Sequence, residues 1–272
     1  MTVRLARDDL GLPVAVPRDV KRIVSIVPSL TETIACSDGA SRLVGVTDWC
    51  THPPEVVADL RRVGGTKNPD VAAIVALAPD LVIANEEENR PADLDALRAA
   101  GLSVWVTGPE TVTAAVTSLG RLLAACGLGE GARSWYRDVV DGWPVFEDSA
   151  EAPVVRRRAV TFIWRKPWMV LGRSTFAGDL LARLGLDNVF EDHADRYPTV
   201  ELDDVRRLDV DLVVLPDEPY SFGAQDGPEA FASWGVPVAL VSGRHLTWYG
   251  PSLAQAREVL TAQLAAAVPP GS

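Results

Sequence analysis

The feature that most constrains this chain is a regular alternation of short β-branched runs with longer helical stretches. Strands separated by helices form βαβ units and therefore parallel sheets. The runs predict strands at residues 22–27, 43–46, 81–84, 104–106, 159–163, 168–170, 212–215 and 238–241. We therefore expect an α/β fold whose central sheets are mostly parallel.

A faint internal repeat divides the chain. In each copy a proline-containing turn, at 68–71 or 197–200, leads through a helical stretch to an aspartate and then a strand. A generic αβ pattern repeated by chance is the alternative. The repeat predicts two Rossmann-like lobes, which we assign to residues 1–125 and 151–272, with a connecting backbone helix at 126–150.

Composition excludes several classes of protein. The formal net charge of −11 argues against nucleic-acid binding, which needs clustered cations. No run approaches the ~18 apolar residues of a membrane span. The N-terminus lacks the apolar core of a signal peptide and a lipobox. We expect a cytoplasmic protein as the sequence stands, and an extracytoplasmic one if a leader has been removed.

Helix starts and thiols have simple interpretations. Ser29 and Glu32 have the spacing of a capping box, and Asn68 before Pro69 is typical of a second N-cap. Three cysteines without CxxC spacing indicate buried thiols rather than disulfides or a zinc site.

Ligands of parallel sheets bind beyond the carboxyl ends of the strands. Aromatic residues gather at those ends and favour a flat, largely apolar ligand, although core packing is the alternative for each one. The predicted aromatic contacts are Trp49, Trp164, Trp168, Tyr197, Tyr220, Trp248 and Tyr249. The polar groups expected to orient the ligand are Thr66, Lys67, Glu86, Arg165 and Asp217.

Signals for catalysis are poor. The chain has no G-x-S-x-G elbow, no G-x-G-x-x-G fingerprint and no nucleophile with a nearby base, so we predict no catalytic residue. His52, His193 and His245 lie far apart and match no local metal motif. An axial histidine ligand to a macrocycle-bound metal stays open, and metal ligation is unknown.

Three segments, 22–32, 63–65 and 77–83, resemble the helical-backbone solute-binding proteins of metal-chelate ABC importers, with the cobalamin binders as the nearest branch. Residues 8–14 resemble the first hairpin of that family. The resemblance implies two lobes joined by one helix and a shallow aromatic cleft between them. It also implies cleft positions for Trp49, Tyr197 and Trp248.

The resemblance also implies a partner. Family members dock on a permease through one acidic residue per lobe, and the matching candidates here are Asp203 or Glu201 and, less directly, Asp70. Thr66 stands where the family has a cleft tryptophan.

We therefore expect a monomeric, non-enzymatic solute-binding protein. Its ligand would be a corrinoid or another metal chelate such as a siderophore or heme, with no required cofactor and an ABC permease as candidate partner. The alternative is a cytoplasmic enzyme, a sensor or a chaperone built on the same scaffold.

Overall fold

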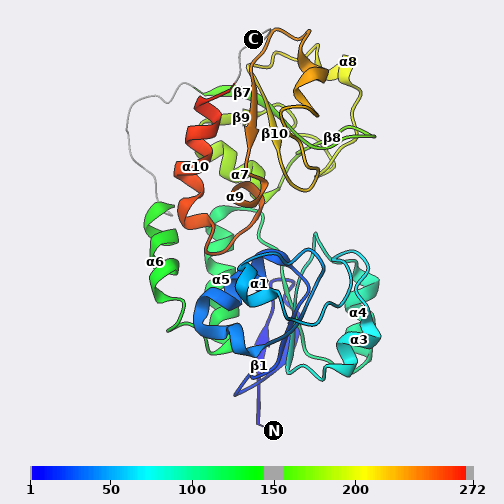
Figure 1. Ribbon diagram of the computed structural model, residues 1–272, viewed down its shortest axis with the longest axis vertical. Helices are drawn as coiled ribbons and strands as arrows, with labels where there is room; N and C mark the ends of the chain where they lie inside the picture. The colour runs from blue at the N-terminus through cyan, green and yellow to red at the C-terminus, as the bar shows by residue number, and fades with distance from the viewer. Residues whose placement is uncertain (1, 144–155, 268–272) are drawn as a thin grey trace. The chain divides into compact units, whose positions relative to one another are not determined.

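The computed structural model describes residues 2–143 and 156–267, which fall into two compact units (Figure 1). The N-terminal unit comprises Met1–Pro109, Ala114–Asp141 and Tyr249–Pro251. The C-terminal unit comprises Glu110–Thr113, Gly142–Trp248 and Ser252–Ser272. Each unit is built around a mostly parallel sheet with helices, so the predicted α/β fold class is confirmed.

The sheet of the N-terminal unit has four parallel strands in the order β4-β3-β5-β6. Every residue of β3, β5 and β6 is buried, as expected for parallel strands that are covered on both faces. The strand bounds are β3 Ile23–Ser25, β4 Leu43–Val46, β5 Leu81–Asn85 and β6 Val104–Thr107.

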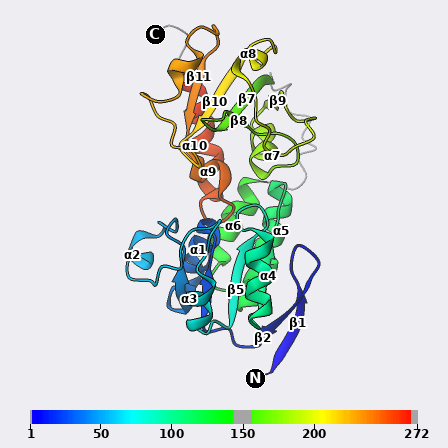
Figure 2. The ribbon, with the colours of Figure 1, turned by 90° about the vertical axis from the view of Figure 1, so that its right-hand side faces the viewer.

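Helices α3 and α4 lie on this sheet (Figure 2). Their side chains Ile74, Leu94 and Leu97 pack against Val24 and Val82 of the strands. Helices α1, α2 and α4 each begin with a proline, which is tolerated there because the first helical N–H groups have no partner within the helix. The helical elements are α1 Pro28–Ile34, η1 Ala35–Gly39, η2 Ala40–Arg42, α2 Pro54–Val57, α3 Val71–Ala76 and α4 Pro91–Ala99.

An antiparallel hairpin opens the chain. Strands β1 (Val3–Arg7) and β2 (Pro13–Pro17) pair with Leu5 opposite Ala15. The turn between them includes Gly11, whose φ of 74° favours glycine. The hairpin expected from the resemblance is confirmed.

The sheet of the C-terminal unit has the order β11-β10-β7-β8, and β9 also pairs with β7. All pairings are parallel except that of β8 with β7. Its core includes Val160, Phe162, Val213 and Phe231. The strand bounds are β7 Arg157–Trp164, β8 Met169–Val170, β9 Leu186–Asn188, β10 Leu212–Pro216 and β11 Val238–Val241.

Two caps fix helix starts in this unit. The Thr175 hydroxyl accepts a hydrogen bond from the Gly178 N–H at 3.1 Å and caps α7, and Ser242 caps α9. The bounds are α7 Phe176–Arg183, α8 Leu202–Val205, η3 Pro228–Phe231, α9 Gly243–Thr247 and the long C-terminal helix α10 Leu253–Ala265.

Between β6 and β7 in the sequence, the described residues up to 143 include the helices α5 (Val112–Cys126) and α6 (Arg133–Gly142). The predicted connecting helix at 126–150 overlaps α6, and its remainder from residue 144 lies outside the described residues. Residues 110–113 belong to the C-terminal unit and residues 249–251 to the N-terminal unit, which the sequence did not suggest. The predicted domain limits stay a prediction.

The internal repeat corresponds to shared topology. In each unit a short helix, α3 or α8, precedes the strand that pairs with the unit's first parallel strand: β5 with β3, and β10 with β7. The next strand, β6 or β11, pairs on the other side. The parallel strands of the two units therefore follow the same order across their sheets.

Some local predictions were wrong. Pro28 occupies the start of α1 and Val27 its N-cap, so Ser29 lies inside the first turn and makes no capping box. Helix α3 begins later than expected and is capped by Asp70, whose carboxylate accepts from the Ala73 N–H at 2.9 Å, not by Asn68. Cys50 and Cys126 are buried as expected, but Cys36 is exposed.

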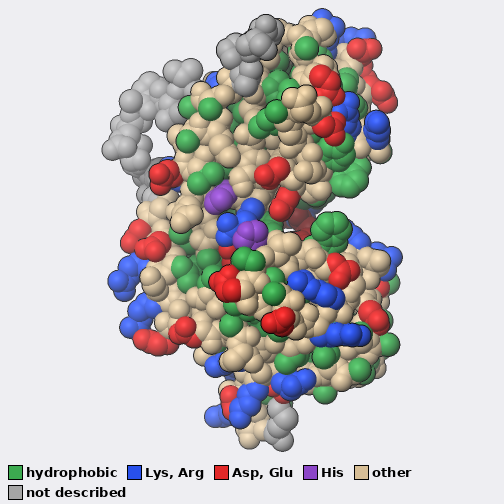
Figure 3. Space-filling view, in the orientation of Figure 1, with side chains coloured by type: hydrophobic (Ala, Val, Ile, Leu, Met, Phe, Trp, Pro, Cys, Tyr) green, Lys and Arg blue, Asp and Glu red, His purple; other side chains and the backbone are tan. Residues whose placement is uncertain are grey.

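Charged side chains of both signs are interspersed over the face shown in Figure 3. Among the helices of residues 2–143 and 156–267, none combines the length and apolar character needed to cross a bilayer. On this face, acidic side chains therefore lie among basic ones.

Candidate ligand-binding surfaces

A pair of aromatic rings, one exposed and one half-buried, lies at the carboxyl edge of the C-terminal sheet. Trp164 ends β7 and its side chain is 41% exposed. Its ring meets that of Tyr220 edge-on, with centroids 5.6 Å apart and planes at 79°. Tyr220 follows β10, which ends at Pro216. Both rings therefore occupy the edge where parallel sheets bind ligands.

The loop that carries Tyr220 is held by charged contacts. The Tyr220 hydroxyl donates to Asp226 Oδ2 at 2.6 Å, and this hydrogen bond is the main reason that the pKa of Asp226 is lowered. Arg165 forms ion pairs with Asp226 and, at 2.6 Å, with Glu229. The loop is therefore fixed to the end of β7.

Trp168 is half-buried and packs against the core of the same unit. It stacks on Phe222 with centroids 6.1 Å apart and planes at 4°, and it meets Phe162 and Phe231 edge-on. The Arg165 guanidinium lies 5.2 Å from its ring centroid. Trp168 thus supports the surface beneath Arg165.

A second polar group lies at the ends of β10 and β11. Asp217 Oδ1 accepts from the Gly243 N–H at 2.5 Å, which ties β10 to the start of α9. The buried Trp248 donates from Nε1 to Glu218 Oε2 at 3.0 Å, and burial raises the pKa of Glu218 despite this bond. The Arg244 guanidinium lies over the Trp248 ring at 5.7 Å.

In the N-terminal unit, Trp49 is well exposed, at 66%. It lies in the loop after β4, beside the loop 64–68. A Cβ on Gly65 would stand 3.6 Å from Trp49 Nε1 and 2.5 Å from Asn68 Oδ1, so glycine is what lets these groups approach. An exposed indole of this kind is available to a ligand.

Two buried asparagines hold the polar loops of this unit. Asn89, 1% exposed, donates to the Ile26 and Thr66 carbonyls at 3.2 and 2.9 Å and accepts from the Asn85 N–H at 2.8 Å. Asn85 Oδ1 accepts from the N–H groups of Glu87 and Glu88 at 2.8 and 3.0 Å. The loops after β3 and β5 and the loop 64–68 are therefore joined.

The predicted polar residues Thr66, Lys67 and Glu86 lie on these joined loops. Lys67 Nζ donates to the Glu87 carbonyl. The Glu86 carboxylate covers Gly108, because a Cβ on that glycine would come within 2.7 Å of it. These three side chains thus share one end of the N-terminal sheet.

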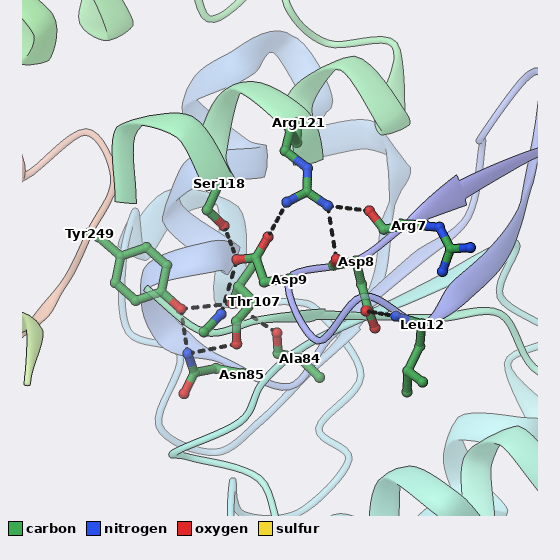
Figure 4. Close-up of polar contacts among 11 residues, drawn as sticks. Arg7, Asp8, Asp9, Leu12, Ala84, Asn85, Thr107, Ser118, Arg121 and Tyr249 are labelled. Carbon is green, nitrogen blue, oxygen red and sulfur yellow. Dashed lines mark hydrogen bonds and ion pairs between the residues drawn. The ribbon is translucent and has the colours of Figure 1, made fainter. Parts of the chain in front are cut away.

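Tyr249 lies inside the N-terminal unit and is only 5% exposed (Figure 4). Its hydroxyl contacts Asn85 Nδ2 and Thr107 Oγ1, each at 2.7 Å. Burial raises the pKa of this phenol well above its ordinary value. These contacts give Tyr249 a structural role.

A comparison with known protein families identifies the kind of protein that has this arrangement. A family model described as periplasmic binding protein matches residues 23–233, most of both units. The chain belongs to this family. Proteins of this family bind solutes, and ligands of parallel sheets bind beyond the carboxyl ends of the strands, the edge at which Trp164 lies.

Named relatives of this periplasmic binding protein are distant. A vitamin B12-binding protein of Vibrio cholerae is 25% identical over 194 residues, which is 70% of this chain and 68% of the relative. The heme-binding protein RhuT of Roseiflexus sp. RS-1 superimposes with a TM-score of 0.75 at 23% identity, over 90% of this chain and 98% of RhuT. The vitamin B12-binding protein BtuF of Vibrio cholerae gives 0.72 at 20% identity, over 92% and 98%. These two structures show the fold alone.

The predicted site residues of this periplasmic binding protein differ in exposure. Trp49 and Trp164 are exposed, Tyr197 and Tyr220 are half-buried, and Trp248 is buried like Tyr249. The structure brings Trp164, Arg165 and Tyr220 together, and separately Thr66, Lys67 and Glu86. Ligand contact itself stays a prediction for all of them.

The three candidate docking acids lie at helix starts. Asp70 caps α3, Glu201 holds the corresponding N-cap position of α8, and Asp203 lies in its first turn. All three are exposed. Asp70 and Glu201 thus hold equivalent places in the repeat.

Sequence reasoning missed Asn85, Asn89 and Asp226. An asparagine pair with i,i+4 spacing at a strand end was an available signal for the first two, since asparagine commonly bonds to nearby backbone. Asp226 had no such signal. Within residues 2–143 and 156–267, no group of three or more His, Cys, Asp and Glu could hold a metal ion.

Proposed function

We propose that this periplasmic binding protein holds a metal chelate of the corrinoid or heme kind, with cobalamin as the leading candidate. The observation that carries the proposal is the Trp164–Tyr220 pair at the carboxyl edge of the C-terminal sheet, in which Trp164 is exposed and Tyr220 half-buried. Aromatic rings suit a flat macrocycle, because each buries roughly 150–250 Å² at little conformational cost. The names of the relatives support the same ligand class.

The proposed contacts are members of the predicted set that are exposed or half-buried and do not pack against the core as Trp168 does. They are Trp49, Thr66, Lys67 and Glu86 in the N-terminal unit, and Trp164, Arg165, Tyr197, Asp217 and Tyr220 in the C-terminal unit. Trp168, Trp248 and Tyr249 support these surfaces from beneath. Membership of a binding-protein family favours a non-catalytic role.

We further propose delivery of the ligand to an ABC permease outside the cytoplasm. Asp70 and Glu201, with Asp203, supply exposed carboxylates at matching helix starts. Charge-reversing variants of Asp70 and Glu201 should reduce uptake in a reconstituted permease while leaving ligand affinity unchanged. Equal uptake by the variants would contradict this role.

Calorimetric titration tests the ligand. Purified protein is titrated with cyanocobalamin, hemin and a ferric siderophore, and the ligands are then recovered and checked by chromatography. We expect saturable binding with a Kd of about 1 μM or less, −8 kcal/mol in binding free energy, and recovery of the unchanged ligand. Failure of all three to bind, or a chemically altered ligand, would contradict a binding role.

A further inference from the structure

We infer that the ion-paired group of Arg165, Asp226 and Glu229 acts as a selectivity element that favours chelates with an uncharged, amide-type periphery over those with carboxylates. The inference rests on the proposed function and deepens it. Its basis is that the arginine beside the exposed rings is already neutralised within the protein.

Arg165 is held on several sides. Its Nη1 pairs with Asp226 and with Glu229 Oε1 at 2.6 Å, and its guanidinium lies 5.2 Å from the Trp168 ring centroid. Only 20% of its side chain is exposed. A ligand carboxylate that approached Arg165 would therefore meet the two protein carboxylates beside it.

The two carboxylates are themselves fixed as anions. Asp226 accepts from the Tyr220 hydroxyl, which lowers the pKa of Asp226 and raises that of Tyr220. Glu229 accepts from the Gly227 N–H at 2.6 Å. Desolvation opposes ionisation of Glu229, but the Gly227 N–H and Arg165 together lower its pKa. At neutral pH the two carboxylates therefore outweigh the single charge of Arg165, and the group is left with a net negative charge.

The charges around this group do not favour an anion either. Lys166 is an exposed cation next to Arg165, and Arg244 lies near Glu218 and Trp248. Over the segments that follow β7, β10 and β11, the acids Asp217, Glu218, Asp226 and Glu229 stand against the cations Arg165, Lys166 and Arg244.

The polar loops of the N-terminal unit have the same character. Lys67 donates to the Glu87 carbonyl and stands among the acids Glu86, Glu87 and Glu88. Carboxylates on a ligand would be repelled by such a surface, whereas amides can donate to its acids and accept from its lysine. Repulsion of this kind is a common source of specificity.

A matched pair of corrinoids provides the test. Dicyanocobinamide carries amides around the corrin ring, and dicyanocobyrinic acid carries carboxylates around the same ring. Calorimetry should give a Kd for the carboxylate form at least about tenfold weaker, the change that ~1.4 kcal/mol produces. Equal or tighter binding of the carboxylate form would overturn the inference and leave the proposed function standing. Failure of both corrinoids and of hemin to bind would contradict the proposed function itself.

The salt dependence of the affinity distinguishes repulsion of the ligand's carboxylates from attraction, and it can be measured on the parent protein. Salt screens the repulsion between exposed charges. Affinity for dicyanocobyrinic acid should therefore rise between low and high ionic strength. A fall in that affinity would indicate a cation that binds the carboxylates, and would overturn the inference.

The double variant Asp226→Asn, Glu229→Gln frees Arg165 while keeping acceptors for the Tyr220 hydroxyl and the Gly227 N–H. We expect it to bind dicyanocobyrinic acid about three- to tenfold more tightly, with the affinity for dicyanocobinamide changed less than about twofold. The control is Asp204→Asn, which removes an exposed acid paired with Arg207 in the same unit. No difference between the double variant and this control would contradict the role of the group.

Discussion

The side-chain amide of Asn85 donates a hydrogen bond of 2.7 Å to the hydroxyl of Tyr249, across 164 positions of the chain. Both residues lie in the N-terminal unit, although Tyr249 comes from the C-terminal half of the sequence. Asn85 also accepts from the N–H groups of Glu87 and Glu88. A short late segment therefore helps to hold a loop that carries candidate ligand contacts (Figure 4).

Tyr249→Phe should destabilise the protein by about 1–2 kcal/mol, because Asn85 and Thr107 each lose a hydrogen-bond partner in a buried site. Urea denaturation followed by circular dichroism measures the change. The matched control is Tyr220→Phe, whose hydroxyl bonds a half-exposed carboxylate and should cost under about 0.5 kcal/mol. Equal losses in the two variants would argue against the buried network.

Asn89→Ala should release the joined loops of the N-terminal unit. The variant loses two donated bonds and one accepted bond at a buried position, so we expect a loss of about 2–3 kcal/mol in unfolding free energy. Hydrogen exchange should quicken at the amides of Asn85, Glu87 and Glu88. Exchange confined to other segments would show that Asn89 does not hold these loops. Exposed Asn68→Ala is the control.

Asp8 should make stability depend on pH. It is 1% exposed, and burial raises its pKa despite the hydrogen bond from the Leu12 N–H and the charge of Arg98 at 3.9 Å. A raised folded-state pKa means that stability is greatest below the unfolded-state value, about 3.9, and is lost as pH rises through the folded-state value.

Asp8→Asn removes this loss, so its stability should exceed that of the parent by on the order of 1 kcal/mol at pH 7, with a smaller difference at pH 4. Denaturation at both pH values measures the two differences. Asp19→Asn, at a side chain that is 71% exposed, should show neither. A difference that grows toward pH 4 would contradict the account.

The sheet strands were predictable from sequence because buried runs such as that around Val82 and Val213 are rich in β-branched residues. Strand β9 was not, since Leu186, Asp187 and Asn188 form no such run. The starts of α1 at Pro28 and of α3 at Val71 were predicted wrongly. Near each start the sequence offers both a proline and more than one side chain that can accept a hydrogen bond as the N-cap.

The candidate site was predictable only in part. Exposed rings such as Trp49 and Trp164 follow strands, and that position is visible in the sequence. The partners of Tyr249 and Arg165 were not visible, because they come from residues far along the chain that only the fold brings close. Residue type alone therefore did not separate the exposed Trp164 from the half-buried Trp168, which packs against the core.

The most direct measurement of the central claim is the affinity for cyanocobalamin of Trp49→Ala and Trp164→Ala, by calorimetry. Both side chains are exposed, so we expect the melting temperature to stay within about 2 °C of the parent. Each variant should bind about tenfold more weakly, the loss of roughly 1.4 kcal/mol of ring contact. The controls Val75→Ala and Leu208→Ala, exposed apolar residues of the same two units, should bind as the parent does. Parental affinity in both tryptophan variants would contradict an aromatic ligand site at the strand ends.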